Sequence, residues 1–167
     1  MTQSVPDMIL RGAGRRTPGR QPEQPASRTR RESALALAQV PFFSALSKKQ
    51  LERLAGDTDV VSFAPAQIVV QEGMLGETMF VVLSGEAKVL KGKRRLGSIR
   101  PGDPFGEIAV LDGSPRSATV IAETPLTAIR LFRRTLLRLL EAEPQITMKI
   151  LDGIVRRIRQ LTSAIDA

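Results

Sequence analysis

The strongest constraint on the fold is a change of hydrophobic period along the chain. Between Asp59 and Phe132, apolar and polar residues alternate in short segments rich in β-branched side chains: VVSF, QIVV, TMFVVLSG, EAKVL, RRLGSI, SATVIAE and LTAIRLF. This alternation predicts β-strands, and eight of the 13 glycines fall in the turns between Gly73 and Gly113. Because no crossover helices intervene, the pattern favours an antiparallel sandwich or jelly roll over parallel βαβ units.

Helical periodicity precedes the strands. The segment ALALAQVPFFSALSKKQLERLAG predicts a short helix, a break at Pro41, and a second helix that begins after Ser47 as N-cap and ends at Gly56. A stripe of leucines on these helices should face a core, at Leu46, Leu51 and Leu54.

Helical periodicity also follows the strands. RRTLLRLLEAEP predicts one helix that stops before Pro144, and PQITMKILDGIVRRIRQLTSAI predicts a longer one. The predicted fold class is therefore α+β, an antiparallel β jelly roll (double-stranded β-helix) with N-terminal helices and two C-terminal helices.

Residue types that are missing narrow the function. The chain contains no Cys and no His, which excludes disulfides, thiol catalysis, sulfur-ligated metals and most zinc, haem and catalytic-triad chemistry. We therefore expect a protein that is not an enzyme and that carries no cofactor or metal. The longest apolar runs, such as Met79–Leu83, are far shorter than the about 20 residues of a membrane span. Without a span or a secretory signal, we expect a cytoplasmic protein.

The positive charge is concentrated at the N-terminus. The formal net charge is +8, and residues 1–31 contribute seven Arg against Asp7 and Glu23. This Pro- and Gly-containing segment has no apolar periodicity, so we expect residues 1–33 to form a disordered basic tail and residues 34–167 to form the domain. A polybasic arm can contact phosphates or anionic lipid, and a solvated leader is the simpler interpretation.

The stretch FGEIAVLDGSPRSATV, which starts at Phe105, carries the functional signal. GEIAVL has the length of a short helix that begins at Gly106, where backbone N–H groups are accessible, and ends at Asp112–Gly113. Pro115 then fixes the chain ahead of Arg116, which we expect to point back toward the start of this helix. A guanidinium beside accessible amides predicts an anion site suited to phosphate.

Glu107 adds a second condition. A carboxylate would repel a nearby phosphate unless a neutral group lies between them. A sugar hydroxyl can donate to the acid while the phosphate binds the arginine, so the pair predicts a nucleotide whose sugar and phosphate are held close together. An internal salt bridge between Glu107 and Arg116 in a domain without ligand is the structural alternative.

These residues closely resemble the phosphate-binding cassette of the cyclic nucleotide-binding domain family, which includes catabolite-activator-type regulators, kinase regulatory subunits and nucleotide-gated channels. VPFFSALSKKQLERLA resembles the leading helices of the family, IVVQEGMLGETMFVVLSGEAKVL its early strands, and RRTLLRLLEAEPQITMKILDGIVRRIRQLT its two closing helices. The chain ends just after the last helix, so we expect no helix-turn-helix of the catabolite-activator type.

The resemblance implies a role for particular residues. Glu107 would bind the ribose 2′-hydroxyl, Arg116 and Ser117 the phosphate, and one residue of the closing helix would cover the base. Backbone groups would approach the ligand at Gly106, Ile108 and Ala109. The base pocket would consist of Val89, Leu96 and Gly97, with Arg157, Thr162 or Ser163 as the covering residue.

The resemblance also implies a function. We expect a non-catalytic signalling sensor that binds a 3′,5′-cyclic nucleotide, with cAMP favoured over cGMP because Ser rather than Thr follows Arg116. Ligand would close the C-terminal helix over the pocket and change its exposure to a second copy or to an unknown effector protein. A homodimer through this helix and simple packing of the helix on its own domain both remain open.

Two other classes of protein fit less well. A metal-dependent cupin is also a jelly roll, but its metal needs His ligands. A transcription regulator acting through DNA or a DNA-binding partner is the alternative function, but the basic tail has neither aromatic interleaving nor a recognition helix. Any DNA binding should therefore be nonspecific and steeply dependent on salt, and specific binding is not expected.

Overall fold

Two four-stranded antiparallel sheets form the body of the protein in the computed structural model, which describes residues 30–165. One sheet has the order β1-β8-β3-β6 and the other the order β2-β7-β4-β5. The strands are β1 (Thr58–Phe63), β2 (Ile68–Val70), β3 (Thr78–Ser84), β4 (Ala87–Lys91), β5 (Arg94–Ile99), β6 (Pro104–Phe105), β7 (Thr119–Ala122) and β8 (Leu126–Phe132). The predicted antiparallel jelly roll is confirmed.

Helices lie before, within and after the roll. They are α1 (Arg30–Ala38), the 3₁₀-helix η1 (Pro41–Phe43), α2 (Lys48–Ala55), α3 (Glu107–Asp112), α4 (Arg133–Ala142) and α5 (Pro144–Ile165). The predicted break at Pro41 and the division of the closing region ahead of Pro144 are both present. Helix α1 begins ahead of the predicted domain start at residue 34, and the rest of the predicted tail, residues 1–29, lies outside the described residues.

The chain builds α2 as the sequence predicts. Ser47 is the N-cap and accepts a hydrogen bond from the Gln50 backbone N–H, while the Gln50 side chain accepts one from the Ser47 N–H. This capping box satisfies two backbone donors that the first turn leaves open. The leucine stripe at Leu46, Leu51 and Leu54 is buried, as predicted.

The central strand β3 contributes to two cores because both of its faces are covered. Met79 and Val81 point toward the helices, where they join a cluster of buried side chains from α1, η1, α2, α4 and α5. Phe80 and Val82 point between the sheets and join the interior of the roll. Alternate residues of one strand therefore fasten the helices to one side of the roll and close its interior on the other.

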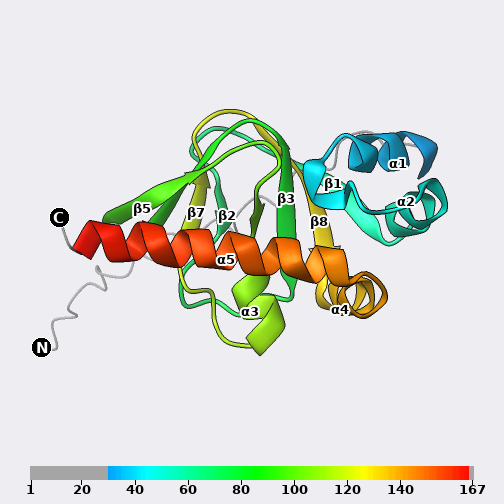
Figure 1. Cartoon of the computed structure of the whole chain (residues 1–167). Helices are drawn as coiled ribbons and strands as arrows, with labels where there is room; N and C mark the ends of the chain where they lie inside the picture. Colours follow the sequence, from blue (N-terminus) through cyan, green and yellow to red (C-terminus); the bar gives the residue numbers. More distant parts are fainter. Residues whose placement is uncertain (1–29, 166–167) are drawn as a thin grey trace, which may run out of the picture.

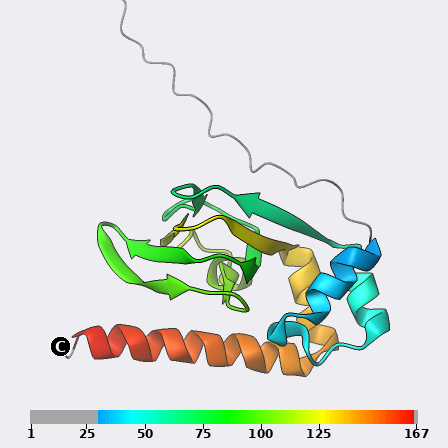
Figure 2. The same ribbon diagram turned by 90° about the horizontal axis from the view of Figure 1, so that it is seen from above.

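Helix α5 runs along one side of the roll, and α1, α2 and α4 gather at one end of the molecule (Figures 1 and 2). The first turns of α5 are anchored in the helical core, where Ile146 and Ile150 are buried. Farther along, α5 passes over β6: a Cβ added at Gly153 would lie 4.0 Å from Pro104 Cγ. Helix α5 is therefore placed over the entrance of the segment that resembles the phosphate-binding cassette.

Strand β6 has no counterpart among the predicted strands. It is two residues long, lies at the edge of its sheet and pairs with Phe80 and Val81 of β3. Pro104 has no backbone N–H to donate to a second neighbouring strand. A position at the edge of the sheet, where only one side of the strand is paired, accommodates it.

None of the helices between residues 30 and 165 combines the length and apolar character that crossing a membrane requires.

Candidate functional site

A cavity of about 270 Å³ opens between the second sheet, α3 and α5. Nine residues singled out from the sequence line it together: Val89, Leu96, Gly97, Gly106, Glu107, Ile108, Ala109, Arg116 and Ser117. They come from four places in the chain, namely β4, β5, the start of α3 and the loop before β7. The fold thus brings the candidate phosphate, ribose and base groups to one hollow.

Arg116 is held at the inner wall of this cavity. Its side chain is 7% exposed, and Nη1 donates to the Gly106 carbonyl at 2.9 Å. Nη2 donates to the Thr78 carbonyl at 2.6 Å and lies 3.2 Å from Thr78 Oγ1. The arginine therefore points back to the residue that precedes α3, the direction that the sequence predicts.

Burial has an electrostatic consequence for Arg116. Loss of solvent lowers the pKa of the Arg116 guanidinium from its ordinary value, and the nearby Glu107 carboxylate opposes that shift. Arginine stays protonated in proteins, so a cation remains at this wall of the cavity. A buried cation favours an anionic ligand more strongly than an exposed one does, because water screens it less.

The guanidinium fits only because Gly76 leaves room for it. A Cβ added at Gly76 would lie 2.3 Å from Arg116 Nε and 2.4 Å from Nη2. The loop that contains Gly76 also holds the Arg116 backbone: the Gly73 N–H donates to the Arg116 carbonyl and the Arg116 N–H donates to the Met74 carbonyl, both at 2.8 Å. The QEGMLG segment is thus part of the site, although the sequence analysis assigned it only to strands.

Glu107 is almost fully buried, with 1% of its surface exposed, and it is the first residue of α3. Gly106 precedes it with φ 82°, and no side chain caps this end of the helix. The first turn of α3 therefore has no side-chain cap over its backbone N–H groups, and Gly106, Ile108 and Ala109 line the cavity beside Glu107.

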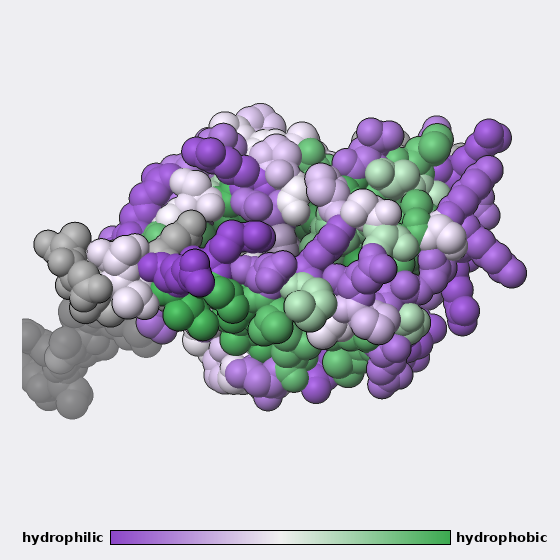
Figure 3. Space-filling view, viewed as in Figure 1, coloured by the Kyte–Doolittle hydropathy of each residue, from purple (hydrophilic) through white to green (hydrophobic). Residues whose placement is uncertain are grey.

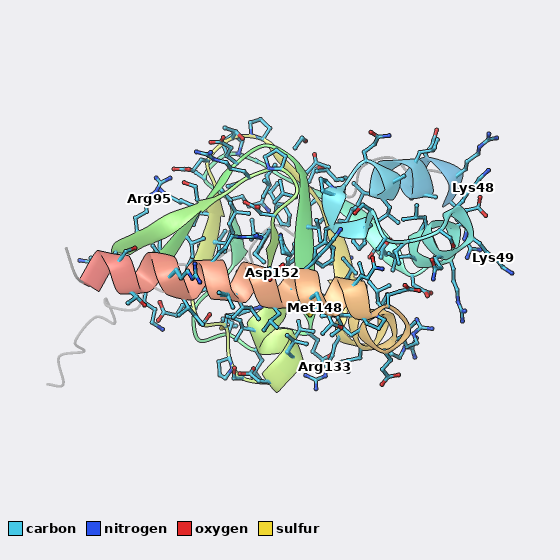
Figure 4. The ribbon with its side chains drawn as sticks, in the orientation of Figure 1. Lys48, Lys49, Arg95, Arg133, Met148 and Asp152 are labelled. Atoms are coloured by element: carbon cyan, nitrogen blue, oxygen red, sulfur yellow. The ribbon has the colours of Figure 1, made fainter. Side chains whose placement is uncertain are left out.

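The other end of α3 is fixed as well. Gly113 forms the C-cap with φ 72°, in agreement with the predicted helix end, and its N–H donates to the Ala109 carbonyl. Arg133 Nη1 donates to the Val110 carbonyl. Figure 4 shows Arg133 beside α3, below α5. The arginine that begins α4 thus binds a carbonyl of the helix that lines the cavity.

Among the described side chains of α5, those that line the cavity are not the predicted covering residues Thr162 and Ser163. Gly153, Ile154, Arg156 and Ile158 face it. Thr162 lies one turn beyond Ile158, is exposed, and donates through Oγ1 to the Ile158 carbonyl of its own helix, so the structure does not bring it to the cavity. Ser163 is likewise exposed and donates to the Arg159 carbonyl, and the side chain of Arg157 lies outside the described residues.

Several other residues of the cavity wall were not predicted from the sequence. Val70, Ala118 and Val120 come from or adjoin the second sheet, Pro104 belongs to β6, and Asp103 precedes it. The alternation of apolar and polar residues in the strands was visible in the sequence. Which face of each strand points into the cavity was not, because that depends on strand register. Arg156 lay within the Arg-rich segment of α5, where spacing did not single it out.

The cavity combines a buried cation at one end with an apolar wall at the other. Arg116 can hold an anion, the Glu107 carboxyl can accept a hydrogen bond from a hydroxyl, and Val89, Leu96 and Val120 offer an apolar surface. The described residues contain no group of three or more potential acidic, His or Cys metal ligands. The arrangement therefore suits an organic anion that carries a hydroxyl and an apolar face.

Comparison with known proteins agrees with this geometry. Residues 60–143 match the family model described as cyclic nucleotide-binding domain. A cAMP-dependent protein kinase regulatory subunit from Hypocrea atroviridis is 32% identical over 125 residues, which covers 75% of this chain and 25% of that protein. A cGMP-dependent protein kinase from Toxoplasma gondii is 38% identical over 118 residues, covering 71% of this chain and 12% of that protein.

A solved structure described as "Sp-2Cl-cAMPS bound to PKAR CBD2" superimposes with a TM-score of 0.68 and 25% identity, over 80% of this chain and 91% of that one. The chain thus spans a quarter or less of the two curated relatives and nearly all of this single domain.

We predict that Gly76→Ala displaces the Arg116 guanidinium, because the new methyl group would occupy its place. Arg116 would then lose its carbonyl partners, and the free energy of unfolding should fall by about 2–3 kcal/mol. Gly97→Ala is the matched control, since a Cβ there meets nothing within 4 Å. Urea denaturation of both variants, with the Arg116 Nε resonance as a local reporter, checks this. Equal stability of the two variants would contradict the assigned role of Gly76.

Proposed function

The chain belongs to the cyclic nucleotide-binding domain family, and on that premise we propose that it is a non-catalytic sensor of a 3′,5′-cyclic nucleotide, with cAMP favoured over cGMP. The buried Arg116 guanidinium, 2.9 Å from the carbonyl that precedes α3, is the observation that supports this best. Its hydrogen-bond partners in the described part of the chain are oxygens of Gly106 and Thr78 that carry no net charge, so a positive charge is kept at the cavity wall.

The proposed ligand pose follows from three parts of the cavity: the cationic end, the Glu107 carboxyl and the apolar wall. The phosphate binds Arg116, Ser117 and the backbone at the start of α3, and the ribose 2′-hydroxyl donates to Glu107. The base lies against Val89, Leu96 and Gly97. Arginine carries five N–H donors, more than the three contacts described for Arg116, so it can bind phosphate while still held by protein carbonyls.

The size of the cavity bears on the ligand class. A cavity of about 270 Å³ lies just below the usual range of ligand pockets, about 300 to 1,000 Å³. A mononucleotide is therefore the proposed ligand in preference to a cyclic dinucleotide. The relatives include both a cAMP-dependent regulatory subunit and a cGMP-dependent kinase, so the preference for cAMP rests on Ser117.

A thermal-shift panel tests the proposal. The full chain is melted with cAMP, cGMP, cyclic dinucleotides and 5′-AMP. A ligand at 100 times its Kd should stabilise the folded state by about 2.7 kcal/mol. We expect the largest increase in Tm with cAMP, a smaller one with cGMP, and little with 5′-AMP, which lacks the ring. No shift with either cyclic mononucleotide would refute the function.

We predict that Arg116→Ala weakens cAMP binding by about 2–5 kcal/mol, because it removes the charge that faces a desolvated phosphate. Glu107→Ala should cost less, about 1.5–3 kcal/mol, the range for a hydrogen bond to a charged group. Isothermal titration calorimetry measures both, with the exposed Arg134→Ala as the control for loss of one positive charge. Wild-type affinity in Arg116→Ala would overturn the assignment of the site.

Helix α5 is the proposed mobile element. In this proposal, ligand draws α5 closer over the base, and the output is the altered exposure of the helix to a second copy or to an effector protein. A ligand can drive such a change only through a difference in affinity for the two states. The kinase regulatory relatives favour a signalling output over direct action on DNA.

We predict that Arg156 is the covering residue of α5 that reads the base. Its side chain has only donors, and guanine presents two acceptors, O6 and N7, on the edge where adenine presents one acceptor and one donor. Arg156→Ala should therefore weaken cGMP binding about three- to tenfold more than cAMP binding, and so widen the preference for cAMP that rests on Ser117. Competition titrations with both nucleotides measure the ratio, and Thr162→Ala serves as the control. An unchanged ratio would exclude Arg156 from base recognition.

A homodimer through α5 is the remaining part of the proposal. Met148, Leu151, Val155 and Ile158 recur at spacings of three and four residues, and each is at least 40% exposed. Figure 3 shows apolar surface along this helix. This is the pattern of a coiled-coil seam. We predict that sedimentation equilibrium detects a dimer that Leu151→Asp dissociates, whereas Asp152→Ala, one position away, leaves it intact. A monomeric wild-type chain at 100-micromolar concentration, roughly the range that a weak dimer needs, would contradict this.

A further inference from the structure

Lys91 connects the β4–β5 hairpin to the loop that carries the phosphate residues. Its Nζ donates to the Ser117 carbonyl at 2.9 Å and forms an ion pair with Glu72 Oε1 at 2.9 Å. The β4–β7 ladder ends at the pair formed by Leu90 and Thr119, so Lys91 and Ala118 follow just beyond it. The ammonium group therefore replaces the next rung of the ladder with a side-chain contact.

The contact fixes the orientation of one peptide group. The carbonyl of Ser117 and the N–H of Ala118 belong to the same planar trans peptide, so the two groups point in opposite directions. Lys91 binds the carbonyl from the exposed side of the hairpin, with 56% of its own side chain exposed. Both Ser117 and Ala118 line the cavity. The Ala118 N–H therefore points away from Lys91, in a residue that itself lines the cavity.

Glu72 holds Lys91 in this position. Its second oxygen accepts a hydrogen bond from the Gly92 N–H at 2.9 Å, and its own N–H donates to Thr119 Oγ1 at 3.0 Å. The Gly92 N–H and then Lys91 lower the pKa of the Glu72 carboxyl below its usual value, so it is a carboxylate at neutral pH. Glu72 thus links the tip of the β4–β5 hairpin, through Gly92 and Lys91, to Thr119 at the start of β7. Both ends of this link lie close to the Ser117–Ala118 peptide that Lys91 binds.

From these contacts we propose that Lys91 is a positioning residue for cyclic nucleotide binding. By holding the Ser117 carbonyl, it presents the Ala118 N–H to the phosphate next to Arg116. Glu72 orients Lys91 and ties the hairpin to the same loop. The proposal deepens the function proposed above and rests on it, because it assigns a further donor and its support to the phosphate end of that site.

The expected effect is moderate because Lys91 is exposed. An exposed ion pair contributes little by itself. What Lys91 supplies is the orientation of one backbone donor, and a single hydrogen bond makes a modest contribution to binding. Loss of Lys91 should therefore weaken binding about three- to tenfold, far less than loss of Arg116.

The experiment compares Lys91→Met with Lys93→Met in the full chain by calorimetric titration with cAMP and cGMP. Both variants remove one positive charge from the same hairpin, and Lys93 is exposed and takes no part in the described contacts to Ser117. We expect a three- to tenfold loss for Lys91→Met, less than twofold for Lys93→Met, and near wild-type affinity for Lys91→Arg. The ligand-induced shift of the Ala118 amide resonance should shrink in Lys91→Met alone.

The outcomes separate this inference from the function on which it rests. A wild-type chain that binds neither nucleotide refutes the proposed function. Wild-type binding with equal affinity in Lys91→Met refutes only the role of Lys91. Equal losses in the two Met variants would indicate a long-range charge effect, and a lower ligand-free Tm that Lys91→Arg fails to restore would indicate a structural role. Either result would overturn the positioning role.

Discussion

The site depends on one arginine, Arg116, whose charge is largely removed from water and held by neutral oxygens of the protein. Moving a charged side chain from water to a protein interior is costly unless polar groups replace its hydration. Here the replacements are carbonyl oxygens of Gly106 and Thr78, which carry only partial charge. These carbonyl oxygens hold the guanidinium in place. Because they carry no net charge, the positive charge of Arg116 stays available to an anionic ligand. An anion that enters the cavity would therefore meet a cation that is already desolvated and oriented.

That arrangement links the cavity to the helices that follow the roll. Gly106 is both an acceptor for Arg116 and the N-cap of α3, so the position of the arginine and the start of the helix are set together. At the other end of α3, the Val110 carbonyl accepts a hydrogen bond from Arg133, the first residue of α4. A short helix held at both ends cannot shift at one end alone. Movement at the phosphate end should therefore reach α4 through Arg133.

The sequence predicted the parts of this site that depend on local chemistry. Ser47 and Gly56 mark the ends of α2, and Gly113 marks the end of α3, because capping and turn preferences act over a few residues. The pairing of Glu107 with Arg116 in one cavity was also predictable, since both lie within one short segment with a single turn between its helix and strand.

Features that depend on register and on helix direction were not predictable. Lys91 meets Ser117 because β4 pairs with β7, and no local pattern determines which strands become neighbours. The role of Gly76 is a matter of empty space beside a distant side chain. Several polar residues of α5 were equivalent by spacing, and the path of the helix past Pro104 is what brings Gly153, Arg156 and Ile158, among its described side chains, to the cavity. Tertiary geometry decided each of these, as it does for most binding-site details.

The two halves of α5 differ in a way that limits how any closure can work. The first half is anchored: Ile146 and Ile150 are buried, and Lys149 donates to the Pro41 carbonyl and to Ser44 Oγ of the leading helical segment. The second half carries the exposed apolar residues Val155 and Ile158. Among the described side chains of α5, those that line the cavity run from Gly153 to Ile158, at the transition between these halves. A bound base can alter the balance between positions of α5 only through that transition, because a ligand shifts an equilibrium by its difference in contacts between the two states. The anchored half, tied to the leading helices, would then carry the change to the far end of the domain.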